Sequence, residues 1–186
     1  ENIPEVDAIV GKNSFTEIAW VIDEVMKGRR FVYLDEAGYV PNQPRMLTTP
    51  SYMAYLKIAE GCDNRCSYCA IPQICGPYTS RPYEDVMAEA KELAASGIKE
   101  IIVVAQDTTR YGEDLYGKLM LPQLLKDLNE LEGVEWIRVM YLYPNNFNDE
   151  LIEAFATLDK VCKYIDIPLQ HASDALLSSM NRFDTK

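Results

Sequence analysis

The chain has 186 residues, of which 48% are hydrophobic and 25% are charged. These values are typical of a soluble globular protein with room for one ordinary domain and part of another. No apolar run approaches the roughly eighteen residues of a membrane span, and no signal-peptide pattern opens the chain. We therefore expect no membrane partner and a location in the reducing cytoplasm.

The net charge is −11, from 29 acidic and 18 basic residues. Such a surface repels phosphate backbones, so nucleic acid is not an expected partner of this segment, whereas a basic protein would be attracted to it. The alternative is an acidic surface that serves solubility alone.

The first module predicted along the chain is short. Residues 6–10 are predicted to form a strand, followed by a helix over about residues 14–27 that ends at Gly28. The apolar residues of that helix share one face: Phe15, Ile18, Ala19, Ile22, Val25 and Met26. Residues 35–50 are rich in proline and have little periodicity, which is typical of a linker.

From residue 52 onward, strand patterns alternate with helical patterns. Strands are predicted over residues 52–58, 98–105, 134–143 and 163–169. A helix follows each of them, with its start indicated by Pro82, Pro122, Asn148 and Ser173 respectively. Four consecutive βα units imply a parallel sheet with right-handed crossovers, either as a doubly wound sheet or as a barrel.

Polar residues follow the predicted strands. They lie in residues 61–69, 106–111, 145–146 and 170–173. Because chemistry in both architectures collects at the carboxyl ends of the strands, we expect these segments to surround a shared site.

The most specific motif is C-x3-C-x2-C, formed by Cys62, Cys66 and Cys69. Three thiolates from one short loop can hold three irons of a cubane cluster, which leaves the fourth iron without a protein ligand. An open iron on a redox cluster can bind a substrate or cofactor and pass it an electron. The motif therefore favours an enzyme.

Other uses of the cysteines are less consistent with the sequence. Five cysteines are too few, and odd in number, for a disulfide framework. A zinc site would have to draw further ligands from Cys75, Cys162 and His171. Cys75 could also close a four-thiolate site, although we interpret it as a bystander. A non-catalytic zinc or iron–sulfur module is thus the alternative from another functional class.

The C-x3-C-x2-C motif, with an aromatic residue (Tyr68) directly before the third cysteine and a βα series around it, resembles the radical SAM enzymes. Within that superfamily, the chain resembles the methylthiotransferases. This likeness runs through residues 55–62, 80–82, 105–112, 141–144 and 167–173, and the last three blocks resemble the branch that modifies an aspartate of a small-subunit ribosomal protein. The tRNA methylthiotransferases of the same family are the alternative.

The resemblance implies an architecture. Residues 51–186 would form a truncated radical SAM core, a partial (β/α) barrel of four consecutive βα units within the α/β class. Residues 1–34 would be the tail of an amino-terminal α/β domain, and residues 35–50 the linker.

The resemblance also implies a chemistry. Cys62, Cys66 and Cys69 would bind a 4Fe-4S cluster whose free iron is chelated by S-adenosylmethionine. An electron from a separate donor would then cleave this cofactor to methionine and a 5′-deoxyadenosyl radical. The radical would remove hydrogen from the β-carbon of the aspartate, where sulfur and a methyl group are installed.

Five further residues are expected to contact the cofactor. Tyr68 would hold the adenine, and Gln106 and Asp107 would bind the amino acid part. Tyr141 and Gln170 would face the ribose or the substrate. From the residue pattern alone, Gln106 and Asp107 could equally form a polar turn or a helix cap, and Tyr141 could be a core aromatic.

Three flanking residues receive weaker assignments. His171, the only histidine, is expected to support the site by hydrogen bonding rather than to bind metal. Lys57 and Glu60 flank the cysteine loop and could pair, although a solvated surface is the simpler interpretation.

The sequence departs from the family in three ways. Residues 1–28 lack the three cysteines with which the amino-terminal domain of the family holds a second 4Fe-4S cluster. The carboxy-terminal substrate-binding domain and two of the usual six βα units are not in the sequence. Cys75 stands where the family usually has arginine. We therefore expect one cluster here, and methylthiolation only in a longer protein.

Overall fold

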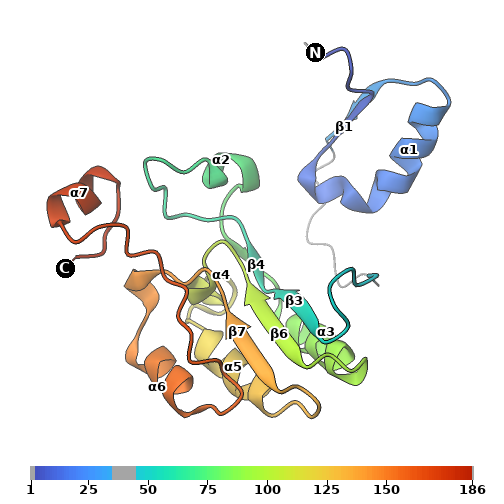
Figure 1. The fold of residues 1–186 in the computed structure, drawn as a ribbon. Helices are drawn as coiled ribbons and strands as arrows, with labels where there is room; N and C mark the ends of the chain where they lie inside the picture. The colour runs from blue at the N-terminus through green and yellow to red at the C-terminus, as the bar shows by residue number, and fades with distance from the viewer. Residues whose placement is uncertain (1–2, 35–44, 186) are drawn as a thin grey trace. The chain divides into compact units, whose positions relative to one another are not determined.

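The computed structural model describes residues 3–34 and 45–185. The chain divides into two compact units, residues 1–44 and 45–186 (Figure 1). Most of the predicted linker, residues 35–44, lies outside the described residues. Across the described ranges, no helix combines the length and apolar character that a membrane span requires.

The first unit is a small βαβ arrangement. It contains β1 (Ala8–Val10), the 3-10 helix η1 (Lys12–Glu17), α1 (Ile18–Met26) and β2 (Phe31–Tyr33). β1 and β2 pair in parallel, from Ala8 opposite Phe31 to Val10 opposite Tyr33. The sequence patterns did not indicate β2, and the predicted helix begins as a 3-10 turn.

The buried face of α1 differs from the face that the spacing of apolar residues predicts. Val21 and Glu24 are buried, whereas four of the six predicted apolar positions are large side chains left exposed: Phe15, Ile18, Ile22 and Met26. Toward the strand pair, the Trp20 ring contacts the ring of Phe31 at a centroid distance of 5.7 Å.

The second unit is built on a three-stranded parallel sheet. Its strands are β3 (Met53–Lys57), β6 (Glu100–Val104) and β7 (Trp136–Val139), in the order β3-β6-β7. The three strands lie side by side in the order in which they occur along the chain. The sheet therefore winds in one direction, as in a barrel wall and unlike a doubly wound sheet. The predicted α/β fold with a parallel sheet is confirmed.

Three helices connect and follow these strands. They are α3 (Tyr83–Ala95), α5 (Leu121–Asn129) and α6 (Asp149–Thr157). α5 contacts both α3 and α6, as expected when right-handed crossovers place successive helices on the same face of the sheet (Figure 1).

The predicted helix starts are confirmed for these three helices. Pro82 directly precedes α3, and Pro122 lies in the first turn of α5, where a missing N–H costs nothing. The Asn148 side chain caps α6 by accepting a 3.0 Å hydrogen bond from the N–H of Leu151.

The core lies between the sheet and these helices. Alternate strand residues point toward the helices and are fully buried, namely Ala54, Leu56, Ile101, Val103, Ile137 and Val139. They meet helix residues such as Val86, Leu124, Leu128 and Leu151. Each large side chain buried here contributes about 1.5–3 kcal/mol.

The fourth predicted strand is wrong. Residues 163–169 have no strand assignment, and only Val161 makes an isolated parallel bridge, to Ile137. Beside them, Tyr141 has positive φ, +59°, which interrupts the extended backbone. Its N–H donates to the Asp166 side chain at 2.8 Å, and the Asp166 carbonyl accepts from the N–H of Leu142 at 2.9 Å. The last helix, α7 (Asp174–Ser179), starts after Ser173 as predicted.

Candidate metal centre

The three cysteines of the motif lie on a loop that is closed at its base. β4 (Ala59–Glu60) pairs antiparallel with β5 (Thr79–Ser80), so residues 61–78 leave and return at the same point. Gly61 has φ +77°, and a Cβ there would lie 2.1 Å from the carbonyl oxygen of Pro77. Only glycine fits at this close approach of Gly61 to Pro77, which we call the neck of the loop. Neither strand, nor α2 (Ile71–Cys75) within the loop, was predicted.

The thiols of Cys62, Cys66 and Cys69 are half-buried. The N–H of Cys69 donates to the carbonyl of Cys66 at 2.9 Å, which closes a turn between two of the three cysteines. Both line a cavity of about 440 Å³, together with Arg65, Ser67, Pro72 and Gln73. Burial raises the pKa of the Cys62 thiol, so a thiolate there requires a positive partner such as a metal.

The three thiols of the loop are a donor set that a cubane cluster can use. In the described parts of the chain, no three Cys, His, Asp or Glu side chains converge on one ion position, and no disulfide joins the cysteines. Zinc holds all its ligands about 2.0–2.3 Å from one centre. A cubane instead takes each thiolate on a different iron, which fits three half-buried thiols spread along one loop. Cys75 lies at the end of α2.

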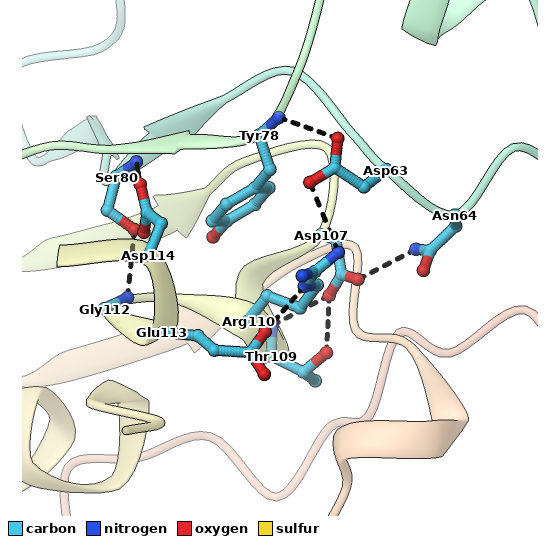
Figure 2. Close-up of polar contacts among 10 residues, drawn as sticks. All are labelled: Asp63, Asn64, Tyr78, Ser80, Asp107, Thr109, Arg110, Gly112, Glu113 and Asp114. Carbon is cyan, nitrogen blue, oxygen red and sulfur yellow. Dashed lines mark hydrogen bonds and ion pairs between the residues drawn. The ribbon is translucent and has the colours of Figure 1, made fainter. Parts of the chain in front are cut away.

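The polar turn after β6 holds the first part of the cysteine loop. Asp107 is fully buried and caps the 3-10 helix η2 (Thr108–Arg110) by accepting from the N–H of Thr109 at 3.1 Å and from the Thr109 hydroxyl. Its other oxygen accepts a 2.9 Å hydrogen bond from the side chain of Asn64 (Figure 2). Burial raises the pKa of Asp107, and these hydrogen bonds oppose the shift.

A second contact fixes Asp63, the residue before Asn64. Its carboxylate accepts from the N–H of Tyr78 at 3.2 Å and lies 3.5 Å from the guanidinium of Arg110 (Figure 2). Arg110 also pairs with Glu113 at 2.9 Å and lies over the Tyr78 ring. The sequence patterns did not single out Asp63, Asn64 or Arg110, because their partners are distant along the chain.

The other side of the loop contacts the segment after α7. The N–H of Ser67 donates to the carbonyl of Met180 at 2.9 Å. The side chain of Asn181 donates to the carbonyl of Arg65 at 2.8 Å. The middle of the cysteine motif therefore lies against residues 180–181, another contact that local sequence patterns do not reveal.

The other residues predicted to contact the cofactor differ from Asp107, because their side chains are not buried. Tyr68, Gln106, Tyr141 and Gln170 are all exposed. The N–H of Thr108 donates to the carbonyl of Tyr141 at 3.0 Å, so the turns after β6 and β7 are joined at the same edge of the sheet. Tyr141 and Gln170 both have positive φ, +59° and +61°.

The flanking residues are engaged locally. The Nδ1 atom of His171 accepts from the N–H of Ser173 at 2.9 Å. Lys57 and Glu60 form a 2.9 Å ion pair at the surface. Such a pair contributes little to stability.

The site places three thiols at the carboxyl edge of a parallel sheet that winds like a barrel wall. Residues 56–186 match the family model of the Radical SAM superfamily, and the chain belongs to that superfamily. The ribosomal protein uS12 methylthiotransferase RimO of Caldanaerobacter subterraneus subsp. tengcongensis is 52% identical over 188 residues, covering 100% of this chain and 43% of that protein. The protein of the same name from Clostridioides difficile is 51% identical, covering 99% and 42%.

The chain thus spans about 43% of the length of the curated relatives it matches. Among solved structures, it resembles the radical S-adenosylmethionine methyltransferase TsrM from Kitasatospora setae with a TM-score of 0.56 and 20% identity. That match covers 72% of this chain and 26% of TsrM. At this identity the likeness supports the fold alone.

Proposed function

We propose that this chain is the radical SAM core of a methylthiotransferase that modifies an aspartate of ribosomal protein uS12. The observation that carries the proposal is the cysteine loop, which presents Cys62, Cys66 and Cys69 at the strand edge where this fold places its chemistry. Relatives about half identical over the whole chain share the name of a uS12 methylthiotransferase, which supports this substrate over tRNA.

In this proposal the three thiolates hold a 4Fe-4S cluster, and S-adenosylmethionine occupies the open iron. When bound, these cofactors supply a 5′-deoxyadenosyl radical that can remove an unactivated hydrogen. The loop supplies ligands with a preset shape, because Asp63 and Asn64 are fixed to the turn after β6. Tyr68, Gln106, Tyr141 and Gln170 remain the proposed cofactor contacts, since all four are exposed and open to a ligand.

The role of Asp107 is revised within the proposal. Its two carboxylate oxygens already accept hydrogen bonds from Thr109 and Asn64. We propose that it positions the cysteine loop rather than contacting S-adenosylmethionine with its side chain.

The proposal also includes the protein substrate, the electron donor and the domain organisation. The acidic balance of the chain suits a basic ribosomal protein as substrate. A cytoplasmic electron donor reduces the cluster. Residues 1–34 belong to an amino-terminal domain that carries a second 4Fe-4S cluster in the longer protein, residues 35–50 link it, and residues 51–186 form the core.

Anaerobic reconstitution with iron and sulfide tests the cofactor assignment. With dithionite and S-adenosylmethionine, the protein is expected to release 5′-deoxyadenosine. The Cys66→Ala variant is expected to lose this product, whereas Cys75→Ser retains it. Zinc in place of iron, or no 5′-deoxyadenosine from wild-type protein, contradicts the proposal and favours a non-catalytic module.

Mass spectrometry of cells that lack the full gene tests the substrate. The methylthio mass on the uS12 aspartate should disappear and return when the gene is restored. Loss of a methylthio-adenosine from tRNA, with uS12 unchanged, would reassign the protein to the tRNA branch.

A further inference from the structure

A buried phenol lies beside one of the proposed cluster ligands. Tyr143 is only 6% exposed, and its hydroxyl lies 3.9 Å from the Sγ atom of Cys66. Sulfur is large and soft, so it accepts hydrogen bonds at longer distances than oxygen does. Once Cys66 binds iron as a thiolate it has no proton, and the tyrosine O–H is then the donor of this contact.

A buried cation lies against the same phenol. Arg182 is 4% exposed, and its guanidinium carbon lies 4.4 Å from the centroid of the Tyr143 ring. A 2.8 Å hydrogen bond to the carbonyl of Pro168 and an ion pair with Asp184 at 3.1 Å fix its position. A buried guanidinium costs desolvation energy that a single carboxylate offsets only in part.

The Tyr143–Arg182 pair lies apart from the base of the cysteine loop. Neither Tyr143 nor Arg182 is needed to close the loop, whose base is formed by β4 and β5.

The charge of Arg182 and the hydrogen bond from Tyr143 bear on how easily the cluster is reduced. Reduction adds one electron to a cluster whose thiolate ligands are already negative. Hydrogen bonds to the sulfurs and nearby positive charge stabilise the reduced form, and burial strengthens both effects because screening by water is lost. A hydrogen-bond donor at Cys66, with a cation against the ring of that donor, therefore raises the reduction potential.

We propose that Tyr143 and Arg182 act as a pair that sets the reduction potential of the cluster at the Cys66 corner. The pair makes the cluster easier to reduce than it would be with the three half-buried thiolates alone. This inference rests on the proposed function, since it requires a redox cluster on the loop.

The first test is Tyr143→Phe, which keeps the ring under Arg182 and removes only the donor. The midpoint potential of the anaerobically reconstituted protein is followed by a dithionite titration, with the electron paramagnetic resonance signal of the reduced cluster as readout. The expected result is a lower midpoint at unchanged iron content. The matched control is Tyr164→Phe, because Tyr164 also lies under an arginine, Arg138, at 5.5 Å. Its midpoint should equal that of wild type.

The second test separates charge from packing at Arg182. Arg182→Lys keeps the positive charge, and Arg182→Gln removes it. The glutamine variant should lower the midpoint further than the lysine variant, whereas a purely structural role predicts equal midpoints at equal iron content. If Arg182→Gln fails to fold, Tyr143→Phe decides the question.

The outcomes distinguish the two proposals. A wild-type protein that forms no redox-active 4Fe-4S cluster overturns the proposed function and this inference with it. A wild-type cluster whose midpoint is unchanged in Tyr143→Phe overturns this inference alone.

Discussion

The side chain of Asn64 donates a 2.9 Å hydrogen bond to the buried carboxylate of Asp107, 43 residues further along the chain (Figure 2). Asn64 lies between two cysteines of the motif, and Asp107 caps the turn after β6. This bond makes the shape of the cysteine loop depend on the sheet. The loop therefore has a defined form before any metal binds.

Replacing Asp107 by alanine should destabilise the second unit. The variant leaves the N–H of Thr109 and the Asn64 amide without their acceptor, and each such group costs about 1–3 kcal/mol when buried. Urea denaturation of the metal-free protein measures the loss. The neighbouring Gln106→Ala, at an exposed position, should change stability by no more than about 0.5 kcal/mol. Equal effects of the two variants would contradict this account.

The stability that Asp107 confers should also depend on pH. Burial raises its pKa in the folded state, so the protonated form favours folding. Its contribution is largest below the ordinary aspartate pKa of about 3.9 and is lost as the pH rises through the raised folded value. The stability of wild type minus that of Asp107→Asn, measured by urea denaturation upward from about pH 4, should therefore fall. A flat difference would show that the pKa of Asp107 is not raised.

A methyl group at Gly61 should open the neck of the cysteine loop. The new Cβ would lie 2.1 Å from the carbonyl oxygen of Pro77, a backbone atom that cannot turn aside. Gly61→Ala should therefore lower both the melting temperature and the iron bound after reconstitution. Gly117→Ala is the control, because Gly117 also has positive φ, +66°, but a Cβ there meets nothing within 4 Å. If the two variants bind iron equally, steric closure at Gly61 is not what shapes the loop.

The caps of two helices should differ in their contribution to stability. The Asn148 side chain accepts from the N–H of Leu151 at the start of α6, and Asn148→Ala should cost about 1 kcal/mol. Ser173 occupies the same position in α7 without a side-chain cap bond, so Ser173→Ala should cost less. Urea denaturation compares them. A larger loss at Ser173 would contradict the observed caps.

The sequence predicted those helices and strands whose bounds are marked by nearby residues or by apolar runs. The starts of α3, α5 and α6 followed from Pro82, Pro122 and Asn148, and the buried strands followed from their apolar runs. The strand predicted over residues 163–169 is wrong. On the facing segment Tyr141 has positive φ, +59°, and its N–H donates to the Asp166 side chain. Periodicity carries no information on such side-chain bonds to the backbone.

Only part of the candidate site could be predicted from the sequence, because local patterns locate the strand ends but not the contacts between distant segments. The expectation that polar segments collect at the strand ends is met where the turns after β6 and β7 join, through Thr108 and Tyr141. The contacts of Arg110 with Asp63 and of Arg182 with Tyr143 depend on tertiary packing between distant segments. No single-sequence pattern signals them.

The cysteine loop is held by residues 107–114 on one side and by residues 143 and 180–181 on the other. During synthesis, the thiols leave the ribosome well before these partners do. The nascent chain thus passes through an interval in which these thiols, the proposed metal ligands, have no scaffold and are open to oxidants. On the proposed function, a cluster is therefore expected to assemble only after the whole second unit has been translated.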